Sequence, residues 1–184
     1  MSRHSYRHRK QIAGKLATEG GDGDRTRYGQ RRRRPGAASA KGDSEAARRH
    51  FETAMPTIEQ LVREHPKSAR QHARLSLLYA YLHRNEDALR ESMQAVELEP
   101  ESENAFHGVT YSVNLALVYA WIGQPDKALT LVERLLRTPG GANYPGEVIS
   151  MTLAELRLRW EWDPLRDNPR FQTILANPEP KTVY

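Results

Sequence analysis

Two short stretches near the N-terminus have residue types and spacings that can bind metal ions. In "HSYRHR", His4 and His8 stand four residues apart, so on a helix their imidazoles would share one face, as zinc ligands can. In "GGDGD", Asp22 and Asp24 stand two apart, as in a calcium loop, but no closing Glu follows at the required distance. Neither stretch has a further ligand, and the chain contains no Cys. We therefore expect no metal site and no cofactor.

The middle of the chain contains groups that serve as acids and bases in enzymes. Four histidines and a run of glutamates lie there: His65, His72, His83 and His107, and Glu97, Glu99, Glu101 and Glu103. No nucleophile stands at a useful spacing from a base, and the alternating glutamates are typical of a solvated rim. No glycine pattern for binding a phosphate or a dinucleotide is present. The sequence therefore predicts a protein that is not an enzyme.

The N-terminal segment carries most of the positive charge. Residues 1–41 hold twelve Lys and Arg against three Asp and Glu, whereas residues 42–184 hold sixteen against twenty. Few apolar residues occur before residue 42, so this segment cannot bury enough surface to offset the entropy of ordering it. We predict a disordered basic tail at 1–41 and a mildly acidic folded domain from 42.

The tail includes "RRRRPG", which gives a second candidate site: Arg31, Arg32, Arg33 and Arg34. Arginines that neutralise phosphates release counterions, so this run is a candidate for binding nucleic acid or another anionic surface. The alternative is a solvated linker with no partner, because no aromatic or groove-reading element accompanies the run.

The chain has no apolar run long enough to cross a membrane and no apolar segment after its basic start. We therefore expect a cytoplasmic protein without a membrane partner.

Two stretches of the chain nearly repeat each other: "LSLLYAYLHRNEDAL" at 75–89 and "LALVYAWIGQPDKAL" at 115–129. Each starts with apolar residues at three- and four-residue spacing, which predicts a helix, and leads through a short polar turn into a second helix. In the turns, Asn85 is a good N-cap, Gly123 ends a helix, and Pro125 suits the first turn of the next. Turns of about three residues make each pair of helices antiparallel. We predict an all-α fold of helix pairs.

These copies resemble the tetratricopeptide repeat (TPR) family, whose unit of about 34 residues follows the pattern W-x2-L-G-x2-Y, A-x3-F and P. The first copy aligns with this pattern through His72, Leu75, Ser76, Tyr79, Ala88, Ser92 and Pro100. The second aligns through Ser112, Leu115, Ala116, Tyr119, Ala128 and Val132, with Pro139 one residue early. In this family small residues, here Ala88, Ala95, Ala116 and Ala128, let two helices approach closely.

The spacing of the copies supports this resemblance. Ala54 precedes Ala88 by 34 residues and Pro66 precedes Pro100 by 34, which indicates half of a preceding unit. The step from Ala88 to Ala128 is 40, so six residues are added, most simply in "ESENAFHG". The resemblance implies an α-solenoid of about two and a half units at 44–66, 67–100 and 107–140. The alternative is an irregular helical bundle whose self-similarity is accidental.

Both ends of the array are expected to be capped. Pro56 interrupts the hydrogen bonding of a helix over 44–64, so we expect a kink or a break there. At the other end we predict a cap over 146–176, with Asn168 as N-cap and Pro169 at the first turn, and a flexible C-terminus at 177–184. The stretch "WDPLRDNPRF" resembles the ends of TPR tails in bacterial multidomain kinases, nucleotide cyclases and winged-helix regulators. The resemblance implies a docking or sensor tail that binds proteins as a scaffold.

One face of each first helix is the candidate partner-binding site. The spacing i, i+4, i+7, i+11 gives Arg70, Arg74, Leu77 and Tyr81 in one unit, and Thr110, Asn114, Leu117 and Trp121 in the next. Arginines beside apolar and aromatic side chains suit a protein or peptide ligand that mixes carboxylates with apolar residues. Tyr81 and Trp121 equally suit packing beneath the capping helices, and the sequence does not decide between groove and core.

Overall fold

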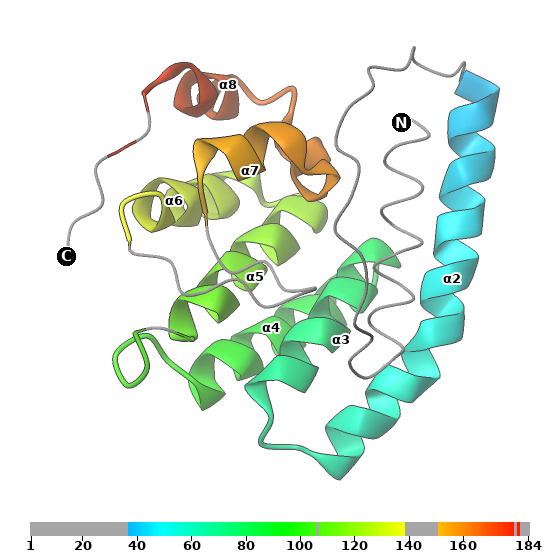
Figure 1. Ribbon diagram of the computed structural model, residues 1–184. Helices are drawn as coiled ribbons and strands as arrows, with labels where there is room; N and C mark the ends of the chain where they lie inside the picture. The colour runs from blue at the N-terminus through cyan, green and yellow to red at the C-terminus, as the bar shows by residue number, and fades with distance from the viewer. Residues whose placement is uncertain (1–36, 106, 139–150, 179, 181–184) are drawn as a thin grey trace, which may run out of the picture.

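The computed structural model describes residues 37–105, 107–138, 151–178 and 180, with side chains from Glu45 onward. Every regular element in these ranges is a helix (Figure 1). In chain order they are α2 (Ala37–Glu64), α3 (Ala69–Tyr81), α4 (Asn85–Leu98), α5 (Gly108–Trp121), α6 (Pro125–Leu135), α7 (Leu153–Leu158), the 3₁₀ helix η1 (Trp160–Leu165) and α8 (Pro169–Ala176). A disordered tail was predicted over 1–41 and a first helix from 44, but α2 already begins at Ala37, so residues 37–41 are helical. Residues 1–36 and the predicted start of the cap at 146 lie outside the described residues.

The predicted helix pairs are present as α3 with α4 and α5 with α6, and α3 also packs against α5. Between the two pairs the chain passes through the stretch that contains the six added residues, and α5 begins at Gly108. A Cβ atom on Gly108 would lie 2.6 Å from the backbone of Glu101, so only glycine lets this loop lie so close to the start of α5. None of the described helices is long and apolar enough to cross a membrane.

The turns inside the two pairs share one backbone geometry. His83 and Gly123, which stand 40 residues apart, have φ angles of 62° and 76°. The N–H groups of Arg84 and Gln124 each donate to the carbonyl five residues back, at 2.8 and 2.9 Å. Such bonds satisfy carbonyls that the end of a helix leaves without a partner. His83 adopts this conformation although it costs a residue with a side chain about 1–2 kcal/mol. The duplication therefore extends from the sequence to the backbone.

Small residues lie where the helices approach each other. Ala88, Ala95, Ala116 and Ala128 are all 0% exposed, as their expected place between paired helices requires. Ala116 and Ala128 belong to the largest core cluster, with Val113, Leu117, Leu129 and Leu135. Ala88 lies in a second cluster with Leu78, and Ala95 in a small third one with Ala69 and Ala73. The predicted role of Asn85 as N-cap is wrong, because the N-cap position of α4 is taken by Arg84 and Asn85 is the first residue inside the helix.

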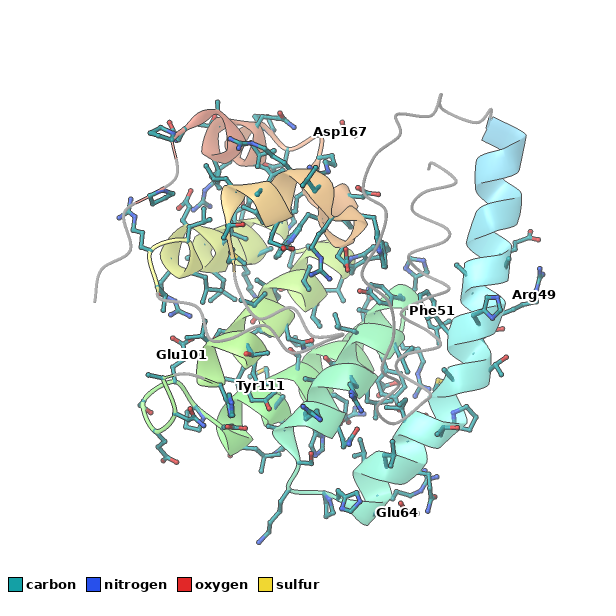
Figure 2. All side chains as sticks on the ribbon, in the orientation of Figure 1. Arg49, Phe51, Glu64, Glu101, Tyr111 and Asp167 are labelled. Atoms are coloured by element: carbon teal, nitrogen blue, oxygen red, sulfur yellow. The ribbon has the colours of Figure 1, made fainter. Side chains whose placement is uncertain are left out.

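Helix α2, which precedes the first helix pair in the chain, packs against α3. It continues through Pro56 without a break, and its axis changes direction between Phe51 and Glu64 (Figures 1 and 2), as expected for a helix that lacks one backbone hydrogen bond. Tyr79 on α3 donates its hydroxyl to Glu59 of α2 at 2.9 Å. Burial, together with this bond to the carboxylate, raises the pKa of Tyr79 to about 12.

The C-terminal segment packs onto the second helix pair, as predicted. η1 contacts α5, and α8 contacts both α6 and α7. The fully buried side chains of this cap include Trp162, Leu165 and Phe171, which join the same core cluster as α5 and α6. The predicted N-cap of α8 is confirmed, because the Asn168 side chain accepts hydrogen bonds from the N–H groups of Arg170 and Phe171.

We expect Ala88→Leu and Ala128→Leu each to lower the free energy of unfolding by about 1–3 kcal/mol, because the paired helices leave no room for a larger side chain. Urea unfolding followed by circular dichroism measures this. Ala154→Leu, at an exposed position of α7, is the matched control and should stay within about 0.5 kcal/mol of the parent. Parental stability of both core variants would contradict the packing.

Candidate functional site

The predicted partner-binding residues lie on two adjacent helices. Four come from α3 and four from α5, and these helices pack side by side. Their exposure differs along the helices. Arg70 is exposed. Four residues are half-buried: Arg74, Leu77, Thr110 and Trp121. Three are buried: Tyr81, Asn114 and Leu117. The exposed Arg70 lies near the start of α3 and the half-buried Thr110 near the start of α5, whereas the buried Tyr81 and Leu117 lie nearer the C-terminal ends.

An aromatic cluster occupies the C-terminal ends of α3 and α5. The Tyr81 ring lies 5.0 Å from Phe51 of α2, 4.9 Å from Trp121 of α5 and 5.3 Å from Trp160 of η1, between ring centroids. Trp121 and Trp160 are themselves 5.7 Å apart, edge to face. At these separations the rings contact one another directly. Figure 2 shows Phe51 on the side of α2 that faces the other helices and Arg49 on the opposite side.

Trp121 is fixed further by a hydrogen bond from its indole N–H to the carbonyl of Glu161, at 2.8 Å. The Glu161 side chain is buried and receives a hydrogen bond of 2.6 Å from Arg159, which also bonds Glu155. Burial lowers the pKa of Arg159, but the bonds and charges of both glutamates outweigh it and leave that pKa above its usual value. The aromatic part of the predicted face is thus tied into the cap and belongs to the core.

Asn114 also serves the core. Its side-chain amide donates to the hydroxyl of Ser76 on α3 at 2.8 Å and to that of Ser92 on α4 at 3.3 Å. The three polar side chains are all buried, so each needs a partner, and together they join three helices. Leu117, which is 0% exposed, packs in the same interior. Neither residue is placed to contact a ligand.

The accessible part of the predicted face lies on the N-terminal parts of α3 and α5 and extends to Leu77, past the middle of α3. Arg70 is exposed there, and Arg74, Leu77 and Thr110 are half-buried; Leu77 also packs against two of the core clusters. Two guanidinium groups can form charge-assisted hydrogen bonds with carboxylates, and Leu77 offers apolar surface beside them. We name these four residues the α3–α5 face. In chemical terms it can bind and orient an acidic segment.

Two sets of polar contacts, made by His72 on α3 and Ser112 on α5, were not predicted from the sequence. His72 places Nδ1 2.7 Å from a Glu91 oxygen and Nε2 3.0 Å from the Pro66 carbonyl. Forty residues later, Ser112 bonds Glu101, which also accepts two bonds of 2.8 Å from Arg134.

The bonds from Arg134 and the bond from Ser112 hold the pKa of Glu101 below its usual range, so this carboxylate stays ionised near neutral pH. His72 and Ser112 occupy the same position in the two copies of the repeat, and this shared position could have indicated from the sequence that both side chains make polar contacts.

The other candidate residues can be placed only in part. His4, His8, Asp22, Asp24 and the arginines 31–34 lie outside the described residues. Within the ranges that the structure describes, no three His, Asp or Glu side chains are grouped so as to hold a metal ion.

We expect Trp121→Ala to lower the free energy of unfolding by about 3 kcal/mol, because it removes a ring from the aromatic cluster and leaves the Glu161 carbonyl without its donor. Trp121→Phe keeps a ring but not the N–H group and should cost about 1–2 kcal/mol. Thermal and urea unfolding test both. If Trp121→Ala unfolds like the parent, the ring is not part of the core.

The geometry thus divides the predicted site into an accessible face at the N-terminal ends of α3 and α5 and an aromatic core at their C-terminal ends. Comparison of the chain with protein-family models, with curated proteins and with solved structures finds no match in any of the three.

Proposed function

We propose that residues 42–176 form a TPR-like helical repeat domain that binds a protein or peptide segment and catalyses no reaction. The observation that carries this proposal is the duplicated helix pair, with the same turn geometry at His83 and Gly123 and the first helices α3 and α5 side by side. Stacked pairs of this kind present their first helices as one continuous surface, and that surface is the usual place for a partner.

The α3–α5 face favours a ligand that combines carboxylates with an apolar side chain. Arg70 and Arg74 supply the positive charge and lie one helical turn apart, so they can contact successive acidic groups of an extended segment. Leu77 continues the same helix face and can pack against an apolar side chain. Because Tyr81 and Trp121 are held by the aromatic cluster, electrostatic contacts rather than aromatic anchors dominate the proposed interface.

The resemblance of the cap to the ends of TPR tails in bacterial multidomain proteins suggests the kind of partner that this domain serves. In such a system the domain acts as a docking tail or scaffold for a separate regulatory or catalytic protein, in the cytoplasm of a bacterium. The domain itself is then a passive binding surface, whose specificity comes from the α3–α5 face.

The arginines 31–34 support a second candidate function, the binding of nucleic acid or another anionic surface. The observation that favours it is the concentration of positive charge in residues 1–41. Deleting residues 1–36 leaves α2 complete and separates the two functions. The deletion should abolish binding to a duplex DNA or RNA probe, and binding of a peptide to the α3–α5 face should persist.

We expect peptides selected from a random display library on the full chain to be enriched in acidic and apolar residues. Changing Arg70→Ala and Arg74→Ala together should weaken the selected peptides about fivefold or more and flatten their salt dependence, because two charge contacts are lost. Arg49→Ala with Arg63→Ala, two exposed positions on α2, is the matched control and should bind like the parent. Selected peptides that bind the Arg70 and Arg74 double variant at parental strength would refute the proposed face.

A further inference from the structure

A cleft separate from the α3–α5 face lies between α8 and the end of α6 with the residues that follow it. Its volume is about 180 Å³, and Pro178 and Pro180 belong to its lining. On one side the cleft is lined by Glu133 of α6 and by Leu136 and Arg137, which follow directly after that helix, and on the other by Arg170, Thr173 and Ile174 of α8. None of the residues proposed for partner binding on α3 and α5 lines it.

The floor of the cleft is apolar. Leu136 and Ile174, only 6% and 7% exposed, form it, and Pro178 adds apolar surface. A cavity of about 150 Å³ with an apolar lining holds a benzene molecule, so this cleft has room for one aromatic or leucine side chain. An apolar side chain that enters it gains burial against both helices.

The rim of the cleft carries a surplus of positive charge. Arg170 donates two hydrogen bonds to Glu133, at 2.9 and 2.7 Å, so the positive charge of one group balances the negative charge of the other. These bonds, and more weakly the charge of Arg137, hold the pKa of Glu133 below its usual range, so the pair stays ionised at neutral pH. Arg137 is exposed and forms none of the ion pairs found among the described residues. One guanidinium of the described rim is therefore available to a carboxylate.

We propose that this cleft is a second docking site, and that it binds a peptide segment of a partner protein in which a Phe or Leu side chain lies next to an acidic residue. The apolar side chain rests on Leu136 and Ile174, and the carboxylate accepts hydrogen bonds from Arg137. Charge complementarity selects this occupant over a neutral or basic segment, because the rim carries one uncompensated positive charge. A module with this cleft and the α3–α5 face can hold one partner at two points, which raises overall affinity without new contacts at either.

The test uses the full chain labelled with ¹⁵N and the probe peptide acetyl-Gly-Asp-Phe-Gly-amide. We expect saturable shifts of amide signals within 133–137 and 170–178. Replacing Asp by Asn in the peptide should weaken binding about two- to fivefold, as the loss of one exposed ion pair does. Replacing Phe by Ala should remove saturable binding, because nothing then fills the cleft.

Two protein variants complete the test. Thr173→Trp, at an exposed position that lines the cleft, should block the probe, and Arg137→Ala should reproduce the loss seen with the Asn peptide. Thr57→Trp, exposed on α2, is the matched control and should bind like the parent. The proposal is overturned if millimolar probe leaves the signals of 133–137 and 170–178 unshifted, or if Thr173→Trp binds at parental strength. The Arg70 and Arg74 double variant leaves this cleft intact and should bind the probe like the parent. A negative result for the cleft is therefore distinct from a negative result for the α3–α5 face.

Discussion

The side-chain amide of Asn114 joins three helices at one buried point, and much of the fold depends on that contact. It donates to Ser76 and Ser92, which lie on α3 and α4, while Asn114 itself belongs to the second helix pair. In an interior of low dielectric, an unpaired amide or hydroxyl costs about 1–3 kcal/mol, so only a narrow range of helix positions satisfies all three groups. This requirement fixes how the second pair sits on the first, and the alanines at the helix contacts permit the close approach.

The rest of the architecture follows from that placement. Once α3 and α5 lie side by side, their C-terminal aromatic residues meet, and Phe51 and Trp160 close the cluster from α2 and η1. Helix α2 and the C-terminal cap are thereby joined through one cluster of aromatic rings. The accessible chemistry is left elsewhere, on the N-terminal parts of α3 and α5 and in the cleft between α6 and α8. Binding is proposed at both places because each combines positive charge with apolar surface.

The sequence predicts much of this arrangement, because helix periodicity and turn residues are local properties. The pairs α3–α4 and α5–α6, the buried alanines and the Asn168 cap could all be read from spacing. Whether Tyr81 and Trp121 face a ligand or the core could not, because periodicity gives the face of a helix but not the distant segment that covers it. The same reason hid the His72–Glu91 contact and the ion pair between Glu133 and Arg170, whose partners are 19 and 37 residues apart. Pro56 was expected to kink or break its helix; the helix continues through it, and its axis changes direction in that part of α2 (Figure 1).

The position of Asn114 tests the packing of the two helix pairs most directly. In a ¹⁵N-edited NOE spectrum of the full chain, its side-chain NH₂ protons should show cross-peaks to the β-protons of both Ser76 and Ser92, because the heavy atoms lie 2.8 and 3.3 Å apart. The same protons should exchange slowly with water, since the site is buried. Cross-peaks to water alone, with none to either serine, would contradict the account, because the second pair would then not sit on the first as described.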